Sequence, residues 1–144
     1  MKFDFSFQKV LDVKEKEKEI AEQEYGTMKL RQLELEDQMD GLESEKDKAF
    51  DLYNHVNRKT VWELIEVQKE IEHVNLKMEQ LKHQSQRIQH EVEQKHQVLI
   101  EKTQEAKMWN QWKAKSKQVF LKQMERQEQA MLDEMAVLRY SRRI

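Results

Sequence analysis

The five histidines are the side chains of this sequence best suited to bind a metal, because the chain has no cysteine. No histidine has a second histidine three or four residues away, the spacing at which two imidazoles on one helix face share a metal ion. Four of them fall outside the helix–helix seam predicted below, namely His73, His83, His90 and His96. We therefore predict no metal site and no cofactor.

Carboxylate pairs are equally weak indications of catalysis. Glu101 and Glu105 share one face of a predicted helix, but an exposed helix gives no desolvated pocket that would tune a pKa for acid–base work. The sequence also has no glycine-rich phosphate loop, no G-x-S-x-G elbow and no acidic calcium loop. We predict that the protein is not an enzyme.

Two tryptophans among lysines raise the question of nucleic-acid binding, since indole rings stack on bases while lysines neutralise phosphates. The formal net charge of −2, from 26 basic and 28 acidic residues, argues against a dedicated nucleic-acid binder. Trp109 also falls at a predicted seam position, which favours a packing role. We predict no nucleic-acid partner for the group formed by Trp109, Trp112, Lys107, Lys113, Lys115 and Lys117.

The composition excludes a compact globular core. Of the 144 residues 38% are charged and 38% hydrophobic, with two glycines and no proline, whereas an average domain is about 25% charged. No apolar run approaches the roughly 18 residues of a membrane span. We expect a cytoplasmic, largely helical protein.

Apolar residues recur in heptads along both halves of the chain. Steps of seven from Phe7 reach Lys14, Ala21, Met28, Leu35, Leu42, Ala49 and Val56, and the companion series is Leu11, Lys18, Tyr25, Gln32, Met39, Lys46 and Tyr53. A second frame runs from Leu64 to Trp109, with eleven of fourteen seam positions apolar. Such a strict repeat is typical of a coiled coil in which each helix has one partner.

Two asparagines followed by Thr60-Val61-Trp62-Glu63, a capping-box pattern, separate the two frames. We therefore predict an all-α fold and a single domain over residues 1–144, an antiparallel coiled-coil hairpin whose second helix is longer. Helix 1 covers about 6–56 with Ser6 as its N-cap, the hinge about 57–60, and helix 2 about 61–142.

In this hairpin, residue i faces roughly residue 117 minus i, so Phe7 meets Asn110. Beyond Trp109 the heptad frame weakens at Lys113 and Ser116, and we expect the stripe to resume displaced, as a four-residue stutter produces. The end of helix 2, from about residue 120, would then have no partner within the chain, and we expect it to be frayed. Because the internal seam uses the heptads, we expect an isolated monomer.

Both ends of the sequence resemble the flagellar export protein FliJ family. Its Gram-positive members begin much like Phe3-x-Phe5-x-Phe7-Gln8-x-Val10-Leu11-x-Val13-Lys14-Glu15. Its carboxy-terminal signature is similar to Met131-Leu132-Asp133-Glu134-x-Ala136-x-x-Arg139. The resemblance implies a non-catalytic coiled-coil stalk in the centre of the hexameric export ATPase ring, which it stimulates.

The same resemblance implies further partners: the cytoplasmic domain of the membrane export gate, and export chaperones that the protein escorts at the inner face of the cell membrane. By matching position, the ring contact would comprise Phe5, Phe7, Leu11, Met131, Asp133, Glu134, Ala136 and Arg139. We expect the phenylalanines and the methionine stripe to gather at one tip of the hairpin. The gate contact would comprise Phe50, Tyr53, Trp62, Val67 and Ile71. Two alternatives remain, a generic coiled-coil spacer or holdase chaperone and the equivalent stalk of a virulence secretion system.

Overall fold

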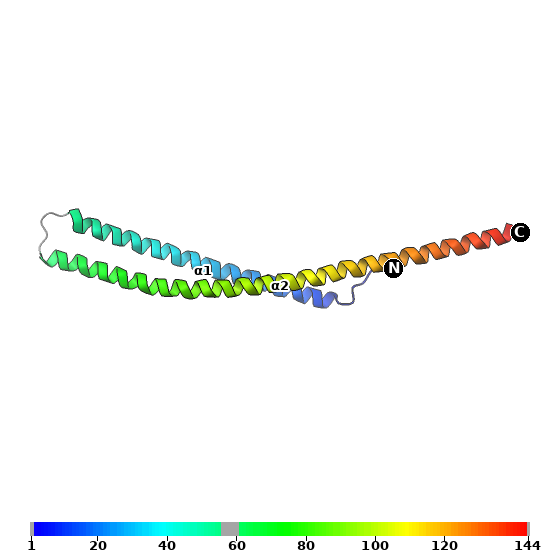
Figure 1. Ribbon diagram of the computed structural model, residues 1–144, viewed down its shortest axis with the longest axis horizontal. Helices are drawn as coiled ribbons and strands as arrows, with labels where there is room; N and C mark the ends of the chain where they lie inside the picture. Colours follow the sequence, from blue (N-terminus) through cyan, green and yellow to red (C-terminus); the bar gives the residue numbers. More distant parts are fainter. Residues whose placement is uncertain (1, 56–60, 144) are drawn as a thin grey trace. The chain divides into compact units, whose positions relative to one another are not determined.

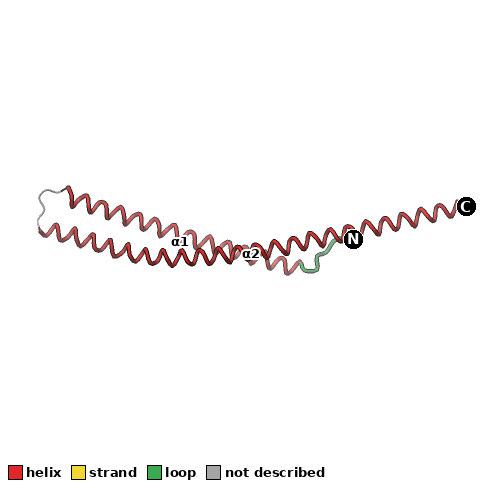
Figure 2. The backbone as a smooth tube through the Cα atoms, viewed as in Figure 1, coloured by secondary structure: helices red, strands yellow, loops and turns green. Residues whose placement is uncertain are grey.

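The computed structural model describes residues 2–55 and 61–143. Two helices, α1 (Gln8–His55) and α2 (Val61–Arg143), account for almost all of this part of the chain and run in opposite directions (Figure 1). Residues 2–7 precede α1 without helical structure (Figure 2), and no described residue lies in a strand. The predicted antiparallel hairpin with a longer second helix is confirmed. The predicted hinge at 57–60 and the seam residue Val56 lie outside the described residues.

Helix α1 begins at Gln8, one residue later than an N-cap at Ser6 predicts. The Leu11 N–H donates to the Phe7 carbonyl at 3.0 Å, which places Phe7, and not the predicted Ser6, at the N-cap. The preceding turn is closed by the Gln8 N–H, which donates to the Phe5 carbonyl at 3.1 Å. The reason is tertiary, because burial of the Phe5 side chain fixes where the extended segment becomes helical.

The chain forms two compact units, each made of one stretch of α1 and one of α2. Unit 1 contains residues 1–19 and 100–144, and unit 2 contains residues 20–99. The single domain over 1–144 therefore stays a prediction.

Unit 2 has the predicted heptad seam. The structure leaves all positions of both α1 series from Ala21 to Lys46 buried or half-buried, and the same holds for the α2 frame from Leu64 to Leu99. Apolar burial of this kind is the main favourable term in folding. The buried residues of this unit are Ala21, Met28, Leu35, Ala49, Val74 and Val92.

Unit 1 continues the seam further than predicted. Leu11 and Ala106 are buried in its core, and Lys113, Ser116 and Phe120 are half-buried at unbroken three- and four-residue spacing. The predicted displacement near 113 is therefore wrong, and the first displaced position is Met124. The cause is the segment ahead of α1, because the Phe3 ring packs 5.5 Å from the Phe120 ring and extends the partner surface beyond the helix.

The structure confirms the predicted pairing to within two residues. The Phe7 ring lies 6.0 Å from the Trp109 ring and 4.9 Å from the Trp112 ring, on either side of the predicted neighbour Asn110. The ion pairs described below join residues whose numbers add up to 119, compared with 117 in the prediction.

Beyond Met124, α2 has no packing partner among the described residues. All side chains from 125 to 142 are exposed, which confirms the predicted overhang, yet the helix continues to Arg143 where we expected fraying. Extension of a formed helix avoids the cost of nucleation, and this stretch has neither glycine nor proline.

We predict that amide hydrogen exchange will be fast after Met124 and slow between Val74 and Val92, because only the latter stretch opens at the cost of exposing a packed seam. Mass spectrometry of proteolytic peptides measures both stretches in one experiment. Equal protection of 125–142 and 74–92 would show that the end of α2 is packed in solution.

Candidate functional site

An aromatic cluster surrounds the start of α1 in unit 1. Phe5 is 7% exposed and meets the Trp112 ring edge-on at 6.0 Å. Phe7 stacks on Trp112 at 4.9 Å with an interplanar angle of 28°, and these two rings stay 42% and 44% exposed. Trp109 lies 5.1 Å from Trp112 and is half-buried in the seam, as predicted. The cluster therefore combines the buried Phe5 with one partly exposed stacked pair, Phe7 and Trp112.

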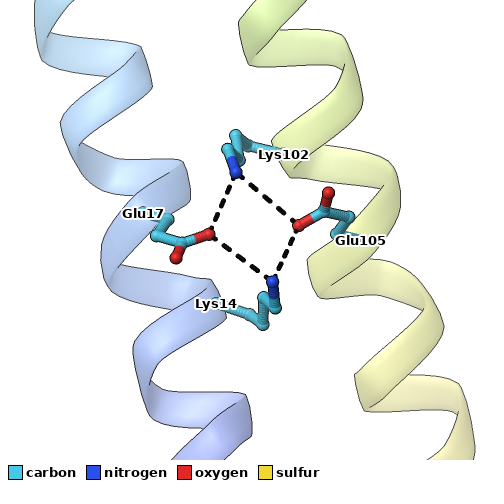
Figure 3. A network of polar contacts seen from close by, with 4 residues as sticks. All are labelled: Lys14, Glu17, Lys102 and Glu105. Carbon is cyan, nitrogen blue, oxygen red and sulfur yellow. Dashed lines mark hydrogen bonds and ion pairs between the residues drawn. The ribbon is translucent and has the colours of Figure 1, made fainter.

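Next to this cluster, four charged residues form a closed ring of ion pairs across the helices (Figure 3). The Lys14 Nζ lies 3.1 Å from the Glu105 Oε2, and the Lys102 Nζ lies 3.2 Å from the Glu17 Oε2. Within each helix the lysine also approaches the glutamate three residues on, at 3.7 Å for Lys14 and 3.8 Å for Lys102. We call these four residues the ion ring.

The ion ring changes the ionisation of two of its members. The hydrogen bond from Lys102, supported by the positive charges of Lys102 and Lys14, lowers the pKa of Glu17 below its usual 4.5. The hydrogen bond to Glu17, with the negative charge of Glu105, raises the pKa of Lys102 above its usual 10.5. Both groups are thus held in their charged forms across the neutral range.

A similar polar contact occurs in unit 2. Lys95, at a seam position, donates to the Glu24 Oε2 at 2.9 Å, and the Tyr25 and His96 rings lie 5.2 Å apart. The heptad pattern placed Lys14, Lys95 and Lys102 at seam positions, where they interrupt the apolar stripe, but it did not reveal their glutamate partners. The sequence does contain an indication of these partners, because the same pattern, Lys-x-x-Glu, occurs on both helices as Lys14-x-x-Glu17 and Lys102-x-x-Glu105.

The structure does not bring together the two groups of predicted ring-contact residues. Phe5 and Leu11 are buried in unit 1, whereas Met131 is 64% exposed on the overhang. At 1.5 Å per residue, Trp112 and Met131 are separated by about 28 Å along α2. The expectation that these groups gather at one tip is wrong. The remaining four, Asp133, Glu134, Ala136 and Arg139, are exposed like Met131.

The predicted gate-contact residues divide into exposed and seam positions within unit 2. Phe50 is 41% and Trp62 77% exposed, and Tyr53 is also exposed. The Lys46 Nζ lies 5.9 Å from the centre of the Phe50 ring, a weak cation–π contact. Val67 and Ile71 are half-buried in the seam.

Two further observations concern the part of the chain that the structure describes. No group of three or more histidine, aspartate or glutamate side chains is arranged to hold a metal ion. Neither helix has a stretch that is long and apolar enough to cross a membrane.

The fold and these surfaces define a class of protein: a two-helix antiparallel coiled coil with exposed aromatic and methionine side chains. Comparison with known families makes the class specific, because the model of the flagellar FliJ protein family matches residues 2–144. The chain belongs to this family. Membership supports a role in flagellar protein export. No curated protein and no solved structure matches the chain.

We predict that Glu17→Gln lowers the thermal unfolding temperature at neutral pH and that this difference disappears in acid. Because the pKa of Glu17 is lowered on folding, its contribution is present above pH 4.5 and is lost as the pH falls through the folded value. The raised pKa of Lys102 has the opposite sense, so its contribution is lost as the pH rises beyond 10.5.

Circular dichroism melts from acid to neutral pH measure this effect. Glu19→Gln, two residues away and exposed, makes the same chemical change outside the ion ring and serves as the matched control. Equal melting of the two variants at neutral pH would contradict a stabilising ion ring.

Proposed function

We propose that this chain is the stalk of the flagellar export ATPase ring, which it enters and stimulates without hydrolysing ATP itself. The observation that carries the proposal is the overhang of α2, where all side chains from 125 to 142 are exposed on a continuous helix. A lone helix presents side chains in every direction and can therefore contact several subunits of a ring that surrounds it. An unpaired amphipathic helix also gains stability from such a partner.

The chemistry of the overhang suits a protein partner. Met131, Met135 and Leu138 form an exposed apolar stripe at four- and three-residue spacing. Methionine side chains adapt to irregular surfaces, which suits contact with subunits in different states. In this proposal Met131, Asp133, Glu134, Ala136 and Arg139 make the ring contact.

The phenylalanine end has a more limited role in the same proposal. Phe7 is exposed and can reach a partner, whereas Phe5 and Leu11 support it from within the unit 1 core. Buried residues of this kind change binding only through the packing of their neighbours.

We further propose that unit 2 binds the cytoplasmic domain of the export gate through Phe50, Tyr53 and Trp62. Large aromatic side chains that are exposed in the free protein often dominate an interface. Val67 and Ile71 support this surface from the seam. Through the gate the protein would lie at the inner face of the cell membrane, where it also escorts export chaperones.

A holdase or spacer is the competing function, because exposed methionines and aromatic rings also suit unfolded clients. The export ATPase distinguishes the two, since a holdase has no reason to change its turnover. A stalk of a virulence secretion system would stimulate the ATPase of that system instead.

We predict that deletion of residues 131–144 abolishes stimulation of the purified export ATPase while the remaining residues of both units stay helical. The deleted stretch contributes nothing to the buried core, so the hairpin should melt as before. Arg139→Glu should weaken stimulation, and Arg142→Glu, which changes the same charge outside the proposed contact, is its control. Full stimulation by the deleted protein would disprove the ring contact.

We predict that Phe50→Ala with Trp62→Ala weakens binding to the gate's cytoplasmic domain by more than about 1 kcal/mol. Thermal stability should change little, because the Trp62 side chain is 77% exposed. Titration calorimetry measures the binding, and Ile71→Ala provides the contrast of a seam residue that lowers stability. A double variant that melts much earlier yet binds the gate normally would assign both rings to hairpin closure.

A further inference from the structure

A second stripe of side chains runs along α2 in unit 1, outside the seam. Its members follow one another at four- and three-residue spacing, so they share one helix face. At 100° per residue, this face lies about 120° around α2 from the seam. We call it the outer stripe, and it consists of Met108, Trp112, Lys115, Val119, Lys122 and Arg126.

Every residue of the outer stripe is exposed in the structure. Among its apolar members, Met108 is 68% and Val119 is 56% exposed. Trp112 packs against the Phe5, Phe7 and Trp109 rings and remains 44% exposed. The other members of the outer stripe are exposed throughout the described part of the chain.

The α2 segment that carries most of the outer stripe contains only positive charges. Between Glu105 and Glu125 the sequence contains five lysines and no acidic residue. No described carboxylate forms an ion pair with Lys115, Lys122 or Arg126. These cations are therefore available to an anionic partner, even though the whole chain is slightly acidic.

We propose that the outer stripe binds the surface of an anionic phospholipid membrane. Basic side chains close to such a surface are attracted by the lipid phosphates, and apolar side chains between them enter the boundary of the acyl region. Tryptophan is favoured at this boundary because its ring is both apolar and a hydrogen-bond donor. Along the outer stripe, Met108 and Trp112 precede Lys115, and Val119 lies between Lys115 and Lys122.

The combination of cations and exposed apolar side chains on one helix face favours a lipid surface over other anionic partners. Phosphates of a nucleic acid would use the cations but would leave Met108 and Val119 in water. An acidic protein surface would use the cations and need a matching apolar groove. A membrane accepts both kinds of side chain along a straight helix.

Co-sedimentation of the full chain with phospholipid vesicles tests the proposal. We expect binding to vesicles of phosphatidylcholine with phosphatidylglycerol, and at least a tenfold weaker association with phosphatidylcholine alone. Salt at roughly 0.5 M, where the screening length is ~4 Å, should release most of the bound protein. Equal binding to both vesicle types would overturn the proposal.

Matched variants assign the binding to this face. Lys115→Glu with Lys122→Glu should abolish vesicle binding, whereas Lys69→Glu with Lys77→Glu makes the same charge change on α2 of unit 2 and should retain most of it. Met108→Ser with Val119→Ser should weaken binding several-fold at unchanged charge. Normal binding by the Lys115/Lys122 variant would overturn the assignment.

The proposal does not depend on the ring contact, because the outer stripe and the segment from Met131 to Arg139 share no residue. If the Lys115/Lys122 variant binds vesicles normally but loses ATPase stimulation, the stripe is a protein contact and the membrane proposal fails. Binding of the unmodified chain to a DNA duplex, without binding to vesicles, would overturn it in favour of a nucleic-acid surface.

Discussion

The burial of one narrow apolar stripe on each helix is the constraint on which the rest of this structure depends. Only nine residues are buried in the described chain, and they lie at or beside a single seam. Everything away from that seam faces solvent, which is why a chain with 38% charged residues can fold at all. The same constraint leaves long surfaces of both helices available to partners.

Apolar contacts repeat with every heptad and therefore do not by themselves choose one register. The cross-helix ion pairs select the register, because all three form together only in the observed pairing. They are Lys14–Glu105, Lys102–Glu17 and Lys95–Glu24. Sliding α2 by seven residues in either direction would break all three pairs and allow only one new pair, Glu17 with Lys95 or Glu24 with Lys102. Most of the other charged partners would then face apolar side chains. Exposed ion pairs add little stability, so their main contribution here is to the choice between similar alternatives.

The sequence predicted the seam well because heptad spacing depends on backbone geometry alone. From Leu11 to Lys46 and from Leu64 to Trp109, every predicted position is at least half-buried. Prediction failed where packing between residues far apart in the sequence determines the structure. At the N-cap, burial of Phe5 moves the start of α1 past Ser6. It failed again at Phe120, whose partner Phe3 lies outside any helical repeat. The separation of Phe7 from Met131 follows from helix rise, which the expectation of a common tip did not take into account.

The ion ring also has a symmetry that bears on association. Its two halves carry the same Lys-x-x-Glu pattern and face each other in opposite directions, so a local two-fold axis relates them. Either half is consequently as complementary to a copy of itself as to its natural partner. What selects the intramolecular arrangement is the short connection between the ends of α1 and α2, which keeps the second half at a high effective concentration. Lengthening or cutting that connection would remove this preference and allow the helices of separate molecules to exchange.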